Sequence, residues 1–159
     1  MTKRALLDQL IAHLTAEVEA MTKAALATHA EATDDENKAE DKYDTRGLEA
    51  SYLAHGQSKA AEEAAQAVAQ FRALPVRDFT AADPIGLGAL VVLESKGAQS
   101  RYFIGPRAGG TEVEIDGQSV MVVTPQSPLG RQLLGRKLGD VLLLDVGGRK
   151  AESRIAAVL

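Results

Sequence analysis

The stretch LDQLIAHLTAEVEAMTKAALAT, residues 7–28, decides the fold of the first half of this 159-residue chain. Its apolar and small residues recur at intervals of four and three, which is the seven-residue repeat of a coiled-coil seam. Such a repeat predicts a long helix that buries one stripe against another helix. The positions of this first seam are Leu7, Ile11, Leu14, Val18, Met21, Ala25 and Thr28.

A second seam with the same spacing follows later in the chain, and its alanines would let two helix backbones approach closely. If the chain folds back on itself, one antiparallel register pairs Leu7 with Leu74 and Thr28 with Leu53. The two seams therefore predict a helical hairpin within one chain, and we expect a monomer. The alternative is a parallel dimer of long helices. The second seam consists of Leu53, Gln57, Ala60, Ala64, Ala67, Phe71 and Leu74.

The segment between the seams, EATDDENKAEDKYDTRGLE at residues 31–49, is strongly acidic. It holds eight Asp or Glu against three Lys or Arg, whereas the whole chain has a net charge of only −4. A solvated loop is the ordinary explanation for such a run. Thr33 and Glu36 also form a capping box, which predicts that a helix starts at Thr33. Helices of roughly 28 residues would hold these acids about 40 Å from the second half of the chain.

The second half of the chain reads as a small sheet. Asp116-Gly117 and Gly147-Gly148 each separate two strand-like runs, as hairpin turns do. The stretch SPLGRQLLGRKLGD, residues 127–140, predicts a short helix with Ser127 as its N-cap and Pro128 at its first position. Prolines at 75 and 84 bracket the junction between the halves, because proline ends a helix.

Together these patterns predict an α+β protein with two domains. An antiparallel α-helical coiled-coil hairpin occupies residues 1–75, with an acidic tip at about 31–49. A linker at 76–84 leads to an antiparallel β-sheet domain with one short helix at 85–159.

Composition excludes several classes of protein. The chain has no Cys and therefore no disulfide or thiol chemistry. It has no apolar run near the roughly 20 residues of a membrane span and no signal-peptide pattern at its start, so we expect a cytoplasmic protein that contacts no membrane. His13, His29 and His55 lack ligand spacing and are read as ordinary helical residues. The Gly-rich stretch GPRAGG at 105–110 lacks the phosphate-loop pattern and predicts a turn.

The stretch VVTPQSPLGRQLLGRKLGDVLLL, residues 122–144, resembles the C-terminal signature of the bacterial GreA/GreB transcript-cleavage factors. GLGALVVL, residues 86–93, is similar to the first strand of the same domain in that family. The architecture resembles the family from end to end. The positions that match the signature are Ser127, Pro128, Leu134, Gly135, Arg136, Gly139 and Asp140.

The resemblance implies a fold and a function. The C-terminal domain would be FKBP-like and dock on RNA polymerase at the rim of its secondary channel. The coiled coil would pass down that channel and meet the 3′ end of the nascent RNA indirectly. Tip acids would help to hold a second Mg²⁺ in the polymerase active site, so that the polymerase cleaves backtracked RNA. The protein would be no enzyme itself and would hold no cofactor stably, since the Mg²⁺ is shared with the polymerase.

The resemblance also gives candidate site residues. Glu36 and Asn37 match the Glu-Asn of the family's tip motif, and Thr33 stands where that motif has aspartate. An acidic pair at Asp41 and Asp44 offers a second arrangement. The candidate metal-facing acids are Asp34, Asp35, Glu36, Asp41 and Asp44. The candidate polymerase-binding residues are Ser127, Pro128, Leu129, Arg131, Arg136 and Lys137.

Three other functions remain open at this point. A factor of this family could block the secondary channel and inhibit the polymerase without stimulating cleavage. An FKBP-like prolyl isomerase would need an aromatic-lined pocket, and residues 84–159 supply only Tyr102 and Phe103. A plain coiled-coil dimerisation protein would leave the turn chemistry of residues 124–140 without a role.

Overall fold

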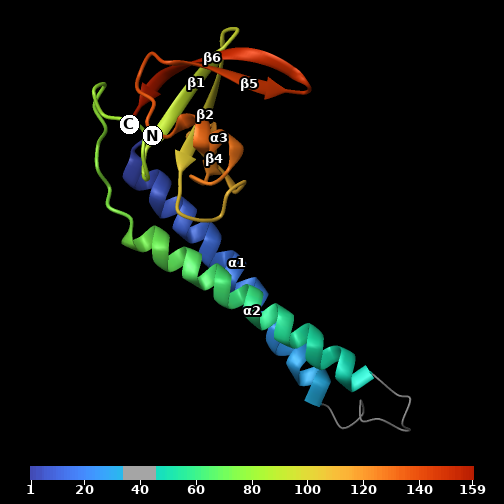
Figure 1. The fold of residues 1–159 in the computed structure, drawn as a ribbon. Helices are drawn as coiled ribbons and strands as arrows, with labels where there is room; N and C mark the ends of the chain where they lie inside the picture. The colour runs from blue at the N-terminus through green and yellow to red at the C-terminus, as the bar shows by residue number, and fades with distance from the viewer. Residues whose placement is uncertain (34–45) are drawn as a thin grey trace. The chain divides into compact units, whose positions relative to one another are not determined.

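The computed structural model describes residues 1–33 and 46–159 (Figure 1). Two long helices precede a six-stranded sheet that carries one short helix. This confirms the predicted fold class. The helices are α1 (Lys3–Thr33), α2 (Arg46–Ala73) and α3 (Pro128–Leu133). The strands are β1 (Leu90–Ser95), β2 (Ala98–Ile104), β3 (Glu112–Ile115), β4 (Gln118–Val123), β5 (Val141–Val146) and β6 (Arg149–Val158).

The chain forms two compact units. The helical unit comprises Ile11–Ala69, and the sheet unit comprises Met1–Leu10 together with Gln70–Leu159. The sheet unit therefore contains the first turns of α1 and the end of α2 in addition to all six strands. The division into 1–75, 76–84 and 85–159 stays a prediction. In the described ranges, no helix has the length and apolar content that crossing a bilayer requires.

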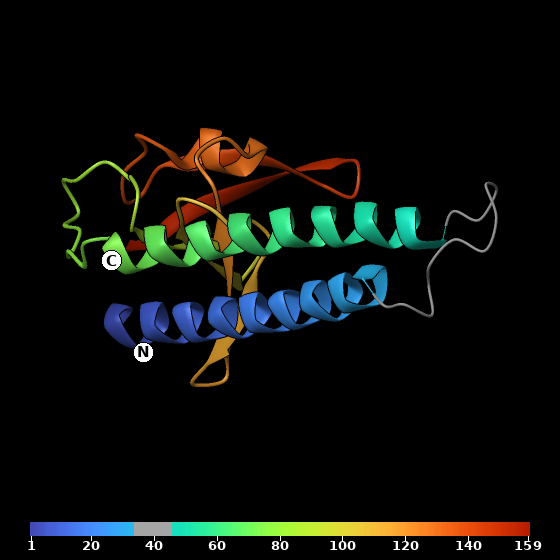
Figure 2. The same ribbon diagram turned by 90° about the horizontal axis from the view of Figure 1, so that it is seen from below.

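In the helical unit, α1 and α2 run side by side in opposite directions (Figures 1 and 2). The α1 seam is mostly as predicted. Leu14 and Ala25 are buried, and Ile11 and Val18 are half-buried. Met21 is the exception, because its side chain is 39% exposed.

The predicted seam of α2 is wrong at Leu53 and Ala60. Leu53 is 56% exposed and Ala60 is exposed, whereas Ala54 and Ala61 are buried at 5% and 8%. The buried residues Ala54, Ala61 and Val68 are themselves seven residues apart, so the seam keeps its heptad spacing. The predicted row through Leu53 and Ala60 therefore lies one residue later, at Ala54 and Ala61.

This shift predicts opposite outcomes for two neighbouring substitutions. Ala61→Leu should destabilise the helical unit by about 1–3 kcal/mol, because the larger side chain overfills a closely packed seam. Ala60→Leu should change the free energy of unfolding by less than about 0.5 kcal/mol, because this position faces water. Urea denaturation of the two variants measures the difference, and the reverse order would restore the seam predicted from the sequence.

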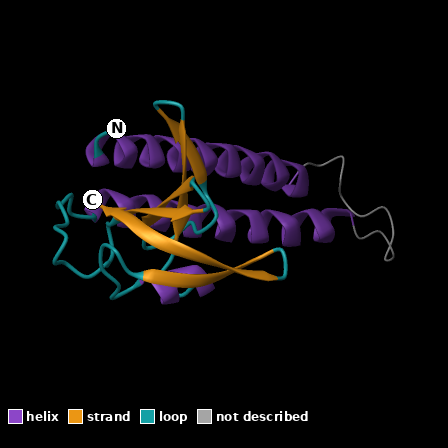
Figure 3. Ribbon diagram, turned by 90° about the horizontal axis from the view of Figure 1, so that it is seen from above, coloured by secondary structure: helices purple, strands orange, loops and turns teal. Residues whose placement is uncertain are grey.

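The sheet has the order β3-β4-β2-β1-β6-β5, and it is antiparallel except where β2 and β4 run parallel. Figure 3 shows its strands in orange. The parallel pair was not expected from the sequence. The loop at 105–111 reverses the chain and brings β3 to the edge of the sheet. The tight turn at Asp116 and Gly117, with φ of 51° and 71°, then returns β4 between β3 and β2.

Both faces of the sheet are covered within the sheet unit. On one face a core forms beneath α3, to which Leu133 contributes a fully buried side chain. On the other face the Phe71 ring of α2 stacks on Phe103 of β2, with ring centroids 6.4 Å apart. Gly105 allows the Phe71 ring to pack this closely, because a Cβ at position 105 would lie 2.9 Å from that ring and 2.8 Å from Val122. The last turn of α2 is thereby fixed to the sheet.

The start of α1 is attached to the sheet unit by polar contacts. The Met1 amino group lies 3.0 Å from the Asp116 carboxylate, and the Gln9 amide donates to the backbone carbonyl of Glu114. Lys3 and Arg77 both lie over the ring of Phe79, and partial burial lowers the pKa of Lys3. The first turns of α1 thus belong to the sheet unit.

Candidate functional site

Helix α3 begins as its sequence predicts. The Ser127 hydroxyl accepts a hydrogen bond from the backbone N–H of Gly130 at 3.0 Å and donates to the carbonyl of Thr124 at 2.8 Å. Pro128 occupies the first turn, where its missing N–H leaves no helical bond unmade. Ser127 and Pro128 therefore set the start and direction of the helix.

Gly130 lets α3 lie directly against the segment that precedes it. A Cβ at this position would lie 1.9 Å from the carbonyl oxygen of Thr124 and 2.8 Å from its carbonyl carbon. Both atoms belong to the backbone, so no side-chain rotation could relieve the clash. The glycine is required here for close approach of two backbones.

The turn after α3 is held by backbone bonds on two sides. Ile85 donates to the carbonyl of Arg136 at 2.7 Å and accepts from Gly135 at 2.9 Å. Gly139 donates to the carbonyl of Ile155 at 2.9 Å, and the Asp140 carboxylate accepts from the Lys137 N–H at 2.9 Å. The turn is thus tied to the segment before β1 and to β6.

Helix α3 and the turn after it carry exposed basic side chains. Arg131, Arg136 and Lys137 are all exposed, and none of them forms an ion pair with a described residue. Leu138, which follows Lys137 in the chain, is 42% exposed. We call these four side chains the α3 surface. Leu138 was missed in the sequence, although an apolar residue within a basic turn is a recognisable signal.

The other predicted polymerase-binding residues have internal roles in this structure. Leu129 is half-buried and packs against the core beneath α3, and the Ser127 hydroxyl is committed to the helix cap. Their assignment to polymerase binding stays a prediction. The three basic candidates are exposed on α3 and on the turn that follows it, whereas Ser127, Pro128 and Leu129 fix that helix in place.

An acidic group lies near the α3 surface. The Asp83 carboxylate accepts hydrogen bonds from the backbone N–H of Thr80 at 2.7 Å and from its hydroxyl at 2.9 Å. The backbone hydrogen bond is the main cause of a lowered pKa at Asp83, and the charges of Arg77 and Lys137 contribute. Asp83 stays ionised at neutral pH and moderates the positive field beside Lys137.

Thr33 is the last described residue of α1. The Thr33 hydroxyl donates to the backbone carbonyl of His29 at 3.1 Å, as threonines within helices do. The helix start predicted from the capping box falls on residues 34–36, outside the described residues. Among described residues, no group of three or more His, Cys, Asp or Glu could hold a metal ion. The candidate metal-facing acids Asp34, Asp35, Glu36, Asp41 and Asp44 all lie outside the described residues.

The structure brings together two histidines that the sequence separates. His29 of α1 and His55 of α2 line one open pocket of about 310 Å³. The antiparallel hairpin places residues before and after the tip side by side, which spacing along the chain does not reveal. Thr33, Ser51 and Ser58 also line this pocket.

Comparison with known proteins gives the relationship of this chain. No protein-family model matches it. Transcription inhibitor protein Gfh1 of Thermus aquaticus is 31% identical over 118 residues, covering 74% of this chain and 73% of that protein. The protein of the same name from Thermus thermophilus is 30% identical over the same length and with the same coverage.

Solved structures with a similar arrangement include Thermus aquaticus Gfh1, with a TM-score of 0.41 and 25% identity over 99% of this chain and 96% of that one. Another is the transcription elongation factor GreA/GreB of Nitrosomonas europaea, with a TM-score of 0.37 and 19% identity over 70% and 91% of the two chains. Gfh1 is itself described as GreA factor homolog 1. On the strength of its sequence identity to Gfh1, the chain belongs to the GreA/GreB-like family of bacterial transcription factors.

Proposed function

We propose that this chain binds RNA polymerase through the α3 surface and regulates transcription by placing its helical hairpin in the secondary channel of the enzyme. The observation that carries the proposal is the 31% identity over 118 residues to a protein named as a transcription inhibitor. The family-like signature at residues 127–140 coincides with the framework that presents the α3 surface, which supports its use for docking.

The α3 surface suits an acidic protein partner. Three cations that form no ion pair with a described residue, together with an exposed leucine, offer charge attraction around an apolar contact, as interfaces with a polar rim commonly do. The turn that carries Arg136 and Lys137 is fixed by backbone bonds to Ile85, so little ordering is needed on binding. A negatively charged surface of the polymerase is the expected counterpart.

The proposed effect on transcription is inhibition, as the names of the relatives indicate. Thr33 is consistent with this direction, because it stands at the position of the family's tip aspartate and has no carboxylate. A hydroxyl bonded to the His29 carbonyl is a poor ligand for Mg²⁺, which prefers carboxylates, phosphates and water. A hairpin that fills the channel without supplying metal ligands would act by exclusion.

Cleavage stimulation is the second candidate, and the acidic run at residues 31–49 favours it. Asp34, Asp35 and Glu36, or Asp41 and Asp44, would then share a second Mg²⁺ with the polymerase active site. That ion would activate the attacking water and stabilise the leaving oxygen at the 3′ end of backtracked RNA.

Halted elongation complexes distinguish the two effects. We expect the full chain to slow RNA extension, in proportion to its occupancy of the polymerase, without releasing short RNA fragments from backtracked complexes. Accelerated fragment release that rises with Mg²⁺ and is lost on changing Asp34, Asp35 and Glu36 to their amides would establish the second candidate. If the folded chain did not bind the polymerase, both candidate functions would be wrong.

A further inference from the structure

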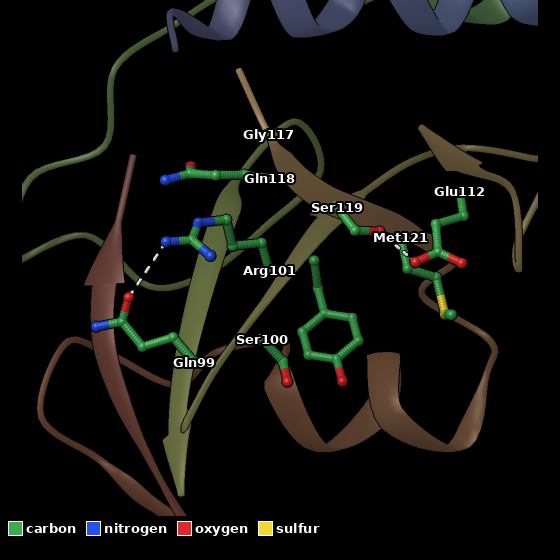
Figure 4. Close-up of a pocket in the computed structure, with 9 residues that line it drawn as sticks. Gln99, Ser100, Arg101, Glu112, Gly117, Gln118, Ser119 and Met121 are labelled. Carbon is green, nitrogen blue, oxygen red and sulfur yellow. Dashed lines mark hydrogen bonds between the residues drawn. The ribbon is translucent and has the colours of Figure 1, made fainter. Parts of the chain in front are cut away.

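The parallel strands β2 and β4 are apart where they begin and pair only toward their C-terminal ends. In the described chain their pairing is confined to three positions, from Tyr102↔Met121 to Ile104↔Val123. Both strands extend further back, to Ala98 and Gln118 respectively, where a continued register would have paired Gln99 with Gln118. Instead an open cavity of about 360 Å³ lies there. We call this cavity the β2–β4 opening (Figure 4). It is lined by Gln99, Ser100, Arg101, Tyr102, Glu112, Gly117, Gln118, Ser119 and Met121.

The parts of β2 and β4 that border this opening are strand edges, because neither is paired with the other there. On its outer side β2 is paired with β1 as far as Ser95↔Ala98, and β4 is paired with β3 as far as Ile115↔Gln118. Alternate residues of each strand direct their N–H and C=O groups away from that partner and toward the opening. An edge of this kind pairs readily with another extended chain.

The side chains at the opening favour a negatively charged ligand. Arg101 is half-buried as a residue, and its guanidinium donates to the Gln99 amide oxygen at 3.2 Å, which occupies one of its five N–H donors. The amide of Gln118 lies on the same side, as Figure 4 shows. The carboxylate of Glu112, on β3, accepts a hydrogen bond from the Ser119 hydroxyl and lies away from Arg101 in Figure 4, so its charge is at the other side of the opening. The remaining donors of Arg101 fit a carboxylate, which guanidinium binds with two parallel hydrogen bonds.

The shape of the opening selects a chain end. A strand inserted between β2 and β4 and paired with both along their whole length would need them about 9.6 Å apart throughout, which is twice the normal strand spacing. The two strands are paired with each other from Tyr102 and Met121 onward, three residues beyond Gln99 and Gln118. An extended segment can therefore enter for about three residues and must end there. A terminal carboxylate would arrive next to Arg101.

From this geometry we propose that the β2–β4 opening binds the C-terminal end of an extended peptide from another protein, with the terminal carboxylate paired to Arg101. Main-chain hydrogen bonds to the unpaired edges of β2 and β4 hold the peptide. The inference is independent of polymerase binding, because the α3 surface contributes none of the residues that line the opening.

The test uses the full chain and a simple β-prone probe, because main-chain bonds and the carboxylate contact do not depend on the probe's side chains. The probe is the N-acetylated tetrapeptide Thr-Val-Thr-Val with a free C-terminal carboxylate, and its counterpart is the same peptide with a C-terminal amide. In amide-proton NMR titrations at millimolar concentration, we expect the acid to shift the signals of Ser100, Arg101 and Ser119. The amidated peptide should bind at least about tenfold more weakly.

Arg101→Gln should weaken binding of the acid by about tenfold or more and abolish its advantage over the amide. Arg107→Gln is the matched control, because Arg107 is an exposed arginine outside the opening and should leave the titration unchanged. Equal binding of acid and amide, equal effects of the two variants, or no shift at the lining amides in a chain with an otherwise native spectrum would overturn the proposal. Loss of polymerase binding by either variant is not expected.

Discussion

Replacing Gly130 by alanine is expected to reduce the free energy of unfolding of the sheet unit by at least about 3 kcal/mol, near the upper end of overpacking effects. The new Cβ would lie 1.9 Å from the Thr124 carbonyl oxygen, and only a displacement of α3 can relieve that contact. Movement of α3 would withdraw Leu133 from the core and break the Ser127 cap. The melting temperature should fall by roughly 6–12 °C, as monitored by far-ultraviolet circular dichroism.

A second glycine in the same chain provides the control. Gly56 lies within α2, and a Cβ there would meet no atom within 4 Å. Gly56→Ala should therefore raise stability by about 0.5–1 kcal/mol, because alanine loses less backbone freedom than glycine in a helix. If both variants were equally stable, the close approach at Gly130 would not be a requirement of the fold. Amide exchange in β4 and β6 assigns any loss to the sheet unit.

Reversing the charge of Arg131, Arg136 and Lys137 together to glutamate should weaken polymerase binding by at least about 100-fold. Opposed like charges across an interface cost several kcal/mol, and each 1.4 kcal/mol is a factor of ten in affinity. The three side chains are exposed, so the fold should be unaffected. Affinity for purified polymerase, measured over a range of salt concentrations, gives the result.

The control for this variant makes the same change in net charge elsewhere on the sheet unit. Arg107, Arg149 and Lys150 are exposed and lie outside the α3 surface, and their reversal to glutamate should reduce affinity by much less. Equal losses in the two triple variants would indicate a general effect of net charge and would reject the α3 surface as the docking surface. A loss confined to the first variant supports docking there.

The elements of this fold with strong local signals were predictable from sequence. Ser127 and Pro128 indicate the start of α3, and the Asp116-Gly117 turn lies between β3 and β4, because capping and positive φ are properties of a few neighbouring residues. The α2 seam was less predictable at Ala54 and Ala61. Small residues on both sides of the stripe leave the choice of the buried row to long-range packing, which placed that row one residue later with the same heptad spacing.

The features that sequence did not predict depend on contacts between distant segments. The parallel pairing of β2 with β4 follows from where the loop at 105–111 places β3, and no local pattern indicates that position. The candidate site divides in the same way. Arg131, Arg136 and Lys137 were identified by charge and motif, whereas the exposure of Leu138 and the β2–β4 opening became evident only in three dimensions.

The discontinuous sheet unit has a consequence for synthesis and for protein engineering. Its fully buried Leu6 and Leu10 leave the ribosome first, but the strands of the same unit are completed only when β6 has been made. The N-terminal segment must therefore wait for nearly the whole chain, as folds with widely separated contacts do. A chimera joined in the segment after Pro75 would separate Leu6, Leu10 and Phe71 from their native partners. Junctions near residues 10 and 70 would exchange the helical hairpin and leave the sheet unit with its own core.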